Sequence, residues 1–228
     1  MNIPENLREL RRIMDRENIA AYIISGTDPH NSEYLPAPWQ QRKWISGFTG
    51  SFGTVVVTAN DAGLWTDTRY FIQAELELAG SGIKLHKLRI PGAIDYPQWL
   101  AEVLEPNTKV GIDGFCMSVS DVRNLKNTLA PKNISIQEQT DLLGEMWLDR
   151  PAFPMGKLIR LDTKYAGETA ASKIAKVREF IRRNQGNAML FSCLDEIAWL
   201  YNIRCNDISY NPVAISYAIV EESKAHLF

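Results

Sequence analysis

The sequence has few cysteines and lacks both a long apolar run and an excess of charge of one sign. Its three cysteines, Cys116, Cys193 and Cys205, are odd in number and far apart, which argues against a disulfide framework. The formal net charge of -2, with both signs interspersed, leaves no basic stripe for nucleic acid or a membrane surface. No stretch approaches the roughly 18 apolar residues of a spanning helix, and the first residues lack a secretory h-region. We therefore expect a cytoplasmic protein that binds neither nucleic acid nor membrane.

The three histidines form no catalytic pattern with a serine or cysteine. Asp28, His30 and Glu33 lie within six residues and could hold a divalent ion, but a hydrogen-bonded or solvated loop is the favoured alternative because no second histidine is near. His86 should face solvent from a predicted strand, and His226 lies near the end of the sequence. We predict no catalytic residue and no metal ligand in this chain.

Hydrophobic patterning predicts an α/β fold with mixed sheets flanked by helices, in two similar units. The first unit spans residues 1–150, the proline- and glycine-containing stretch 151–157 is a linker, and residues 158–228 form a second, incomplete unit. A unit this small buries little surface, so we expect the natural protein to continue past Phe228. The expected helices are 4–14, 69–79, 96–104, one from Ser118, 169–184 and one capped by Ser192; the expected strands are 20–24, 54–58, 64–66, 83–90, 109–113, 133–137, 188–191, 214–220 and 225–228.

A glycine-rich segment precedes one predicted hairpin. Gly47, Gly50 and Gly53 recur every third residue before a β-branched run, where backbone without Cβ can turn sharply or let another chain approach. The segment could cradle a phosphate, but it lacks the lysine of a Walker A loop, so tight packing is the favoured alternative. Ser51 misses the nucleophile-elbow pattern and is interpreted as structural.

Asp67 and Arg69 follow the returning strand of this hairpin, and strand ends in α/β sheets are common ligand sites. A guanidinium fixed by a neighbouring carboxylate can still present donors to an anionic or carbonyl group. A local salt bridge without a binding role is about equally compatible with the composition. Arg69 is therefore the candidate binding residue of the sequence.

Five strings in order make the sequence similar to a known family. It resembles the amino-terminal part of the three-domain X-prolyl (Xaa-Pro) aminopeptidases, the aminopeptidase P branch of the creatinase and prolidase family. The strings are H-N-S-E-Y (30–34), W-I-S-G-F-T-G-S-F-G (44–53), W-T-D-T-R-Y-F (65–71), W-L-D-R-P (147–151) and L-D-E-I-A-W-L-Y-N-I-R (194–204), continued by Y-N-P-V (210–213).

This resemblance implies the creatinase/prolidase N-terminal fold, with its ribonuclease H-like motif, and a homodimeric parent enzyme. It implies a peptide substrate with proline at the second position and a role for Arg69 in substrate binding. The family's two divalent metal ions, usually manganese, bind in a later domain that no position here matches, so this part would shape the substrate cleft and subunit interface without catalysing the reaction.

Three positions depart from the family pattern: Thr68 and Cys205, where glycine is expected, and Phe52, where a small residue is commoner. If those glycines serve positive φ, the local turns differ and Arg69 could point elsewhere. Two alternatives stay open. The chain could be a stand-alone α/β binding or assembly module, or part of a prolidase or creatinase-like amidinohydrolase.

Overall fold

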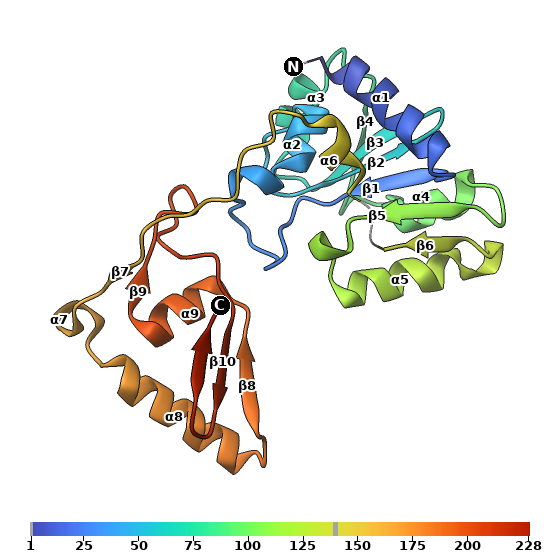
Figure 1. Ribbon diagram of the computed structural model, residues 1–228. Coiled ribbons are helices and arrows are strands. Elements are labelled where there is room, and N and C mark those ends of the chain that lie inside the picture. The colour runs from blue at the N-terminus through green and yellow to red at the C-terminus, as the bar shows by residue number, and fades with distance from the viewer. Residues whose placement is uncertain (1, 139–140) are drawn as a thin grey trace. The chain divides into compact units, whose positions relative to one another are not determined.

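The computed structural model describes residues 2–138 and 141–228, and it divides into two compact units (Figure 1). The first comprises the chain up to Glu33 together with Pro38–Pro151, and the second comprises Tyr34–Ala37 and Ala152–Phe228. Residues 139 and 140 fall within the first predicted domain and lie outside the described residues. The domain boundaries at residues 150 and 158 stay a prediction.

The first unit is built on a six-stranded mixed sheet with the strand order β4-β3-β2-β1-β5-β6. Strand β1 pairs antiparallel with β2 and parallel with β5, β2 pairs antiparallel with β3, and the pairs β3–β4 and β5–β6 are parallel. The predicted mixed α/β fold is confirmed. The strands are β1 (Ala21–Ile24), β2 (Thr54–Thr58), β3 (Ala62–Thr66), β4 (Lys84–Lys87), β5 (Lys109–Ile112) and β6 (Ser135–Gln137).

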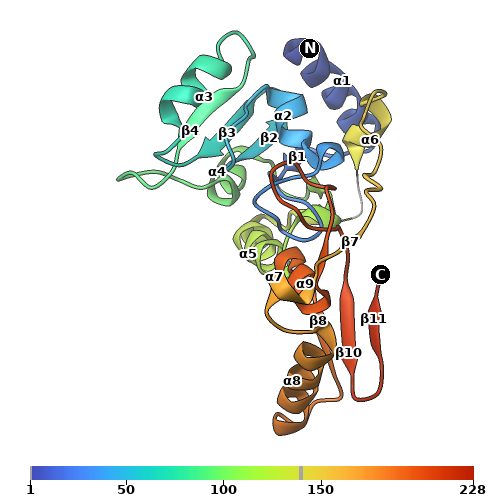
Figure 2. The same cartoon turned by 90° about the vertical axis from the view of Figure 1, so that its left-hand side faces the viewer.

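Helices cover both faces of this sheet, because its central strands alternate apolar side chains between two cores. Tyr22 and Ile24 point to one face, whereas Ala21 and Ile23 point to the other. The first face packs against α1 (Ile3–Arg16), α2 (Gln41–Ser46), α3 (Phe71–Glu77) and α6 (Leu142–Met146), and the second packs against α4 (Tyr96–Val103) and α5 (Val119–Leu129) (Figure 2).

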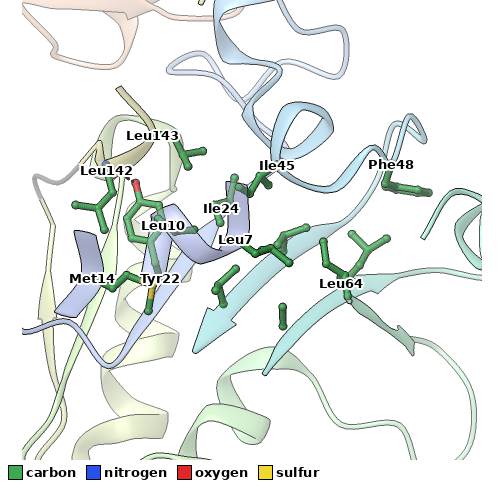
Figure 3. Packing of buried hydrophobic residues seen from close by; sticks show 14 of the residues in the cluster. Leu7, Leu10, Met14, Tyr22, Ile24, Ile45, Phe48, Leu64, Leu142 and Leu143 are labelled. Carbon is green, nitrogen blue, oxygen red and sulfur yellow. Dashed lines mark hydrogen bonds between the residues drawn. The ribbon is translucent and has the colours of Figure 1, made fainter. Parts of the chain in front are cut away.

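The first core is dense around α1 (Figure 3). Leu10 and Tyr22 are fully buried there, and the Tyr22 hydroxyl accepts a hydrogen bond of 3.3 Å from the backbone N–H of Leu142. This hydrogen bond satisfies a buried phenol and ties α6 to β1. Asn2 caps α1, and Asp95 with Gln98 forms a capping box on α4, so local sequence fixes where these helices begin.

The second unit contains an antiparallel sheet in the order β11-β10-β8 and a two-stranded pair of β7 with β9. Its core includes Ile181, Ile197, Leu200 and Val220. Its elements are β7 (Ile159–Arg160), α7 (Thr163–Ala166), α8 (Ala170–Arg183), β8 (Ala188–Phe191), α9 (Leu194–Tyr201), β9 (Ile203–Arg204), β10 (Ala218–Glu221) and β11 (Ala225–Leu227).

Several predicted boundaries are wrong for local reasons. Strand β4 ends at Lys87, not at residue 90, because Arg89 has a positive φ of 60° in the turn that follows. Strand β10 starts at Ala218, not at residue 214, because the Asp207 carboxylate accepts the N–H of Ile215 (3.1 Å) in the preceding segment. Ser192 does not cap α9, whose N-cap position is Cys193. The short elements α2, α6, α7, β7 and β9 carry too little periodicity to be predicted.

Candidate functional site at the end of strand β3

Asp67 is the buried anchor of the site. It follows β3 directly, its side chain is 1 % exposed, and its backbone carbonyl accepts a hydrogen bond of 3.0 Å from the N–H of Tyr70, just before α3. Its carboxylate also accepts the backbone N–H of Arg69 at 3.2 Å. Such an Asx turn fixes the chain where the strand gives way to the helix. The sequence correctly places Asp67 and Arg69 at this strand end.

Arg69 is held by Asp67 and remains accessible. Its Nε donates to Asp67 Oδ1 at 3.0 Å, its Nη2 donates to Oδ2 at 3.0 Å, and its side chain is 55 % exposed. These hydrogen bonds lower the pKa of Asp67 below its usual value, despite the opposing effect of burial. A guanidinium has five N–H donors, so Arg69 is oriented by the carboxylate and retains donors for a ligand.

Arg89 is a second cation on the same carboxylate, and sequence reasoning missed it. Its Nη1 lies 3.4 Å from Asp67 Oδ2. The guanidinium carbons of Arg69 and Arg89 lie 5.8 and 5.5 Å from the centroid of the Phe52 ring. Pro91-Gly92 is a dipeptide typical of a turn, but no sequence signal indicates that Arg89 faces Asp67.

At the three departures from the family pattern, the backbone conformation does not require glycine. Thr68, Cys205 and Phe52 are not among the described residues with positive φ, so their conformations do not require glycine. Phe52 is 38 % exposed and supplies the ring over which both guanidinium groups lie. Arg69 contacts Asp67 through two of its nitrogens, and its contact with a ligand stays a prediction.

The glycine segment is held from inside by Arg42, another residue that the sequence analysis missed. Arg42 is 6 % exposed, and its guanidinium donates to the carbonyl oxygens of Gly50 and of Gly53 (2.9 Å for Gly53). A Cβ on Gly50 would meet the rings of Phe48 and Tyr70. Close packing therefore accounts for Gly50, as the favoured alternative predicted.

The polar groups of this segment are satisfied locally. The N–H of Thr49, which a phosphate would need, donates to Glu77 Oε2 at 2.8 Å. The Ser51 hydroxyl lies 2.7 Å from the Tyr70 hydroxyl. Both contacts favour the structural interpretation of the segment over phosphate binding or nucleophilic catalysis.

Phe52 also lines a pocket of about 290 Å³, whose lining includes neither Arg69 nor Arg89. Residues of the glycine segment line one part of the pocket, and Tyr96 and Met117 also line it. The Ser25 and Thr27 hydroxyls both donate to the carbonyl of Cys116, at 2.6 and 2.5 Å, which fixes the loop beside the pocket. The pocket has polar and apolar walls, and its one charged lining residue is Asp121, so it can accept a small ligand group that is not anionic.

The acidic and histidine residues of the 28–33 loop do not form a metal site. Asp28 Oδ1 accepts the N–H groups of His30 (3.0 Å) and Ser32 (2.9 Å), so this carboxylate shapes its own loop. Among residues 2–138 and 141–228, no three His, Cys, Asp or Glu side chains are grouped so that they could hold a metal ion. The described residues therefore do not fit a dinuclear metal centre of the kind that the resemblance implies for a later domain.

The prediction that His86 faces solvent is wrong. Its ring stacks on Trp65, with centroids 4.0 Å apart, and burial lowers its pKa. His86 lies on β4 and Trp65 on β3, which are register partners in adjacent parallel strands. Cys116 and Cys205 are buried, and burial raises the pKa of each thiol, which disfavours a nucleophilic role.

The chain belongs to the creatinase/prolidase N-terminal domain family. The family described as Creatinase/Prolidase N-terminal domain matches residues 6–146, and a second family of the same description matches residues 149–228. Across the described residues, no helix is long and apolar enough to cross a membrane.

Curated relatives and one solved structure resemble the whole chain. It is 41 % identical to aminopeptidase P2 of Arabidopsis thaliana and 38 % identical to Xaa-Pro aminopeptidase 1 of Dictyostelium discoideum, covering 99 % of this chain in each case. The X-prolyl aminopeptidase of Caenorhabditis elegans, described as a cytosolic enzyme with a di-nuclear active site, superimposes with a TM-score of 0.92 over 100 % of this chain at 34 % identity. The chain spans 32 %, 37 % and 39 % of these three proteins, respectively.

Proposed function

We propose that this chain is the non-catalytic N-terminal part of a metal-dependent Xaa-Pro aminopeptidase that releases an N-terminal residue preceding proline. The observation that carries the proposal is the similarity to the C. elegans X-prolyl aminopeptidase, which extends over both units of the chain at 34 % identity. The parent enzyme would be a cytoplasmic homodimer with two divalent metal ions, manganese by resemblance to the family, in a further domain. The description of the C. elegans protein as a cytosolic enzyme with a di-nuclear active site supports both the location and the pair of metal ions.

In this proposal the first unit helps to bind the peptide through Arg69. The support is geometric, since Asp67 fixes the guanidinium while the side chain stays more than half exposed. A guanidinium oriented in this way can donate to a peptide carbonyl or carboxylate. It supplies binding and orientation, whereas bond cleavage requires groups outside this chain.

The proposal is tested by comparing the peptidase activity of the 228-residue chain with that of the longer protein. The 228-residue chain should not hydrolyse an Xaa-Pro-Xaa tripeptide even with added manganese, whereas the protein encoded by the uninterrupted gene should do so. In that longer protein, Arg69→Lys should raise KM on the order of tenfold, because lysine keeps the charge and loses the bidentate fork. Turnover by the 228-residue chain would contradict the proposal.

The stand-alone module remains the competing function. It predicts that the gene ends after Phe228 and that the purified chain has no activity toward proline-containing peptides. Reading the downstream coding sequence and assaying its product therefore separate the two functions.

A further inference from the structure

We propose that Arg69 and Arg89 together form a carboxylate-binding fork, in which Arg89 is a second ligand-contacting residue. The inference rests on the proposed function and extends it, because it assigns the chemical class of the group that the site receives. The candidate ligand group is a carboxylate of a peptide, either its C-terminal carboxylate or an acidic side chain.

The charge distribution favours an anion. Two guanidinium groups approach one buried carboxylate, Asp67, whose Oδ2 lies 3.0 Å from Arg69 Nη2 and 3.4 Å from Arg89 Nη1. Glu33 also acts electrostatically on Arg69 but forms no ion pair with it among the described residues. The nearby Lys87 is already paired with Glu75 at 2.6 Å. Arg69 and Arg89 together carry two positive charges, and Asp67 supplies one negative charge in direct contact with them. One positive charge is therefore left for an anionic ligand.

The unused donors also favour a carboxylate. Arg69 directs Nε and Nη2 to Asp67, which leaves Nη1 for a ligand. In the described part of the chain, the one polar group that Arg89 contacts is Asp67, through a single nitrogen, and its side chain is 68 % exposed. Two planar guanidinium groups with free N–H bonds match the geometry of a carboxylate better than that of a single carbonyl oxygen.

Phe52 and the backbone hold the two arginines in place. Both guanidinium groups lie over the same Phe52 ring, at 5.8 and 5.5 Å, so neither is a freely extended surface side chain. Arg89 adopts a φ of 60°, a conformation that is uncommon for a residue with a long side chain. The pocket of about 290 Å³ shares Phe52 with the fork, but neither arginine lines it and Asp121 does, so we assign it to an uncharged part of the peptide and not to the carboxylate.

The test is a titration of the 228-residue chain followed by nuclear magnetic resonance of the arginine Nε–Hε groups. The probes are an Xaa-Pro-Xaa tripeptide, the same tripeptide with a C-terminal amide, and the amide carrying glutamate at its third position. We expect the free acid to shift the Arg69 and Arg89 signals and the neutral amide to leave them unchanged. A shift by the glutamate amide would identify an acidic side chain as a second source of the carboxylate.

Substitutions at Arg89 and Lys87 distinguish a specific contact of Arg89 with the carboxylate from a general effect of positive charge. Arg89→Gln should weaken binding of the free acid on the order of fivefold and leave the weak binding of the neutral amide unchanged. Lys87→Gln removes the same charge two residues away and should have little effect on either probe. Arg89→Lys keeps the charge and should recover less than half of the lost affinity, because it lacks the planar fork.

Equal responses to the acid and the amide, or equal effects of Arg89→Gln and Lys87→Gln, would overturn the fork. The peptidase activity of the longer protein is a separate measurement, so the fork and the proposed function can fail independently. If the uninterrupted protein hydrolyses both the acid and the amide, with no preference that depends on Arg89, the fork fails and the proposed function stands. If it hydrolyses neither probe while the acid-specific shifts persist, the fork stands and the proposed function fails.

Discussion

Replacing Arg42 tests whether the glycine loop depends on an internal guanidinium. Arg42 donates to two carbonyl oxygens of the loop, those of Gly50 and Gly53, and its Nε has no hydrogen-bond partner among the described residues. Burial lowers the pKa of Arg42 to about 10, so the group still carries its charge at neutral pH. The side chain therefore combines two favourable hydrogen bonds with the cost of a buried charge.

The size of the effect follows from these opposing contributions. Hydrogen bonds that involve a charged group contribute about 1.5–3 kcal/mol each. The lowered pKa corresponds to a desolvation cost of roughly 3 kcal/mol, which offsets much of that gain. For Arg42→Met we therefore expect the free energy of unfolding of the first unit to fall by about 1–3 kcal/mol.

Arg42→Lys is the matched control because it keeps the charge. A lysine ammonium is strongly hydrated and lacks the planar fork, so it retains the cost of burial and cannot hold both carbonyl oxygens in the same way. We expect Arg42→Lys to destabilise the unit at least as much as Arg42→Met. This order would not be expected if the positive charge alone were important.

The assay is urea unfolding combined with hydrogen exchange. Because the chain has two compact units, peptides covering residues 48–55 are needed to assign the transition to the first unit. Both variants should exchange faster than the wild type over these residues. A lysine variant with wild-type stability and wild-type exchange would refute the two-carbonyl explanation.

Two further substitutions probe two other buried charged groups, Asp67 and Lys173. Asp67→Asn should lower the free energy of unfolding at neutral pH, because the pKa of Asp67 is depressed in the folded state. The ionised carboxylate stabilises the fold fully above the ordinary aspartate pKa of about 3.9. This stabilisation is lost as the pH falls through the lower pKa of the folded state. The difference from the wild type in urea titrations should therefore disappear in strong acid, and a pH-independent difference would contradict the ion-pair explanation. Lys173→Met should destabilise the second unit by about 1.5–3 kcal/mol, because the Lys173 ammonium donates to Trp199 O (2.8 Å) and Asn202 Oδ1 (2.7 Å). Unchanged Trp199 fluorescence together with an unchanged unfolding midpoint would contradict a stabilising role for these two hydrogen bonds.

The sequence predicts the regular elements where periodicity is strong. The apolar spacing of Leu7, Leu10 and Met14 places α1, and the β-branched run at Thr54–Thr58 matches β2. The hairpin turn then puts Asp67 and Arg69 at the end of β3. These features depend on near neighbours in the chain, which is why pattern and turn chemistry are sufficient to predict them.

The missed parts of the site depend on contacts between distant segments. Arg42 is buried because a glycine loop folds around it, and Arg89 approaches Asp67 because β4 lies beside β3 in a parallel pair. His86 is covered for the same reason, since its register partner on β3 is Trp65. No local pattern distinguishes these residues from ordinary surface positions, because strand pairing determines what they contact.

Four titratable groups of the first unit share one property: each keeps a single charge state around neutral pH. Asp67 has a lowered pKa and stays ionised, the Cys116 thiol has a raised pKa and stays protonated, and Arg42, at about 10, stays cationic. A lowered pKa likewise keeps His86 neutral at pH 7. Groups that transfer protons need pKa values near the working pH, whereas groups that orient a ligand need a constant charge. The electrostatics of these four residues therefore do not favour a proton-transferring role for any of them.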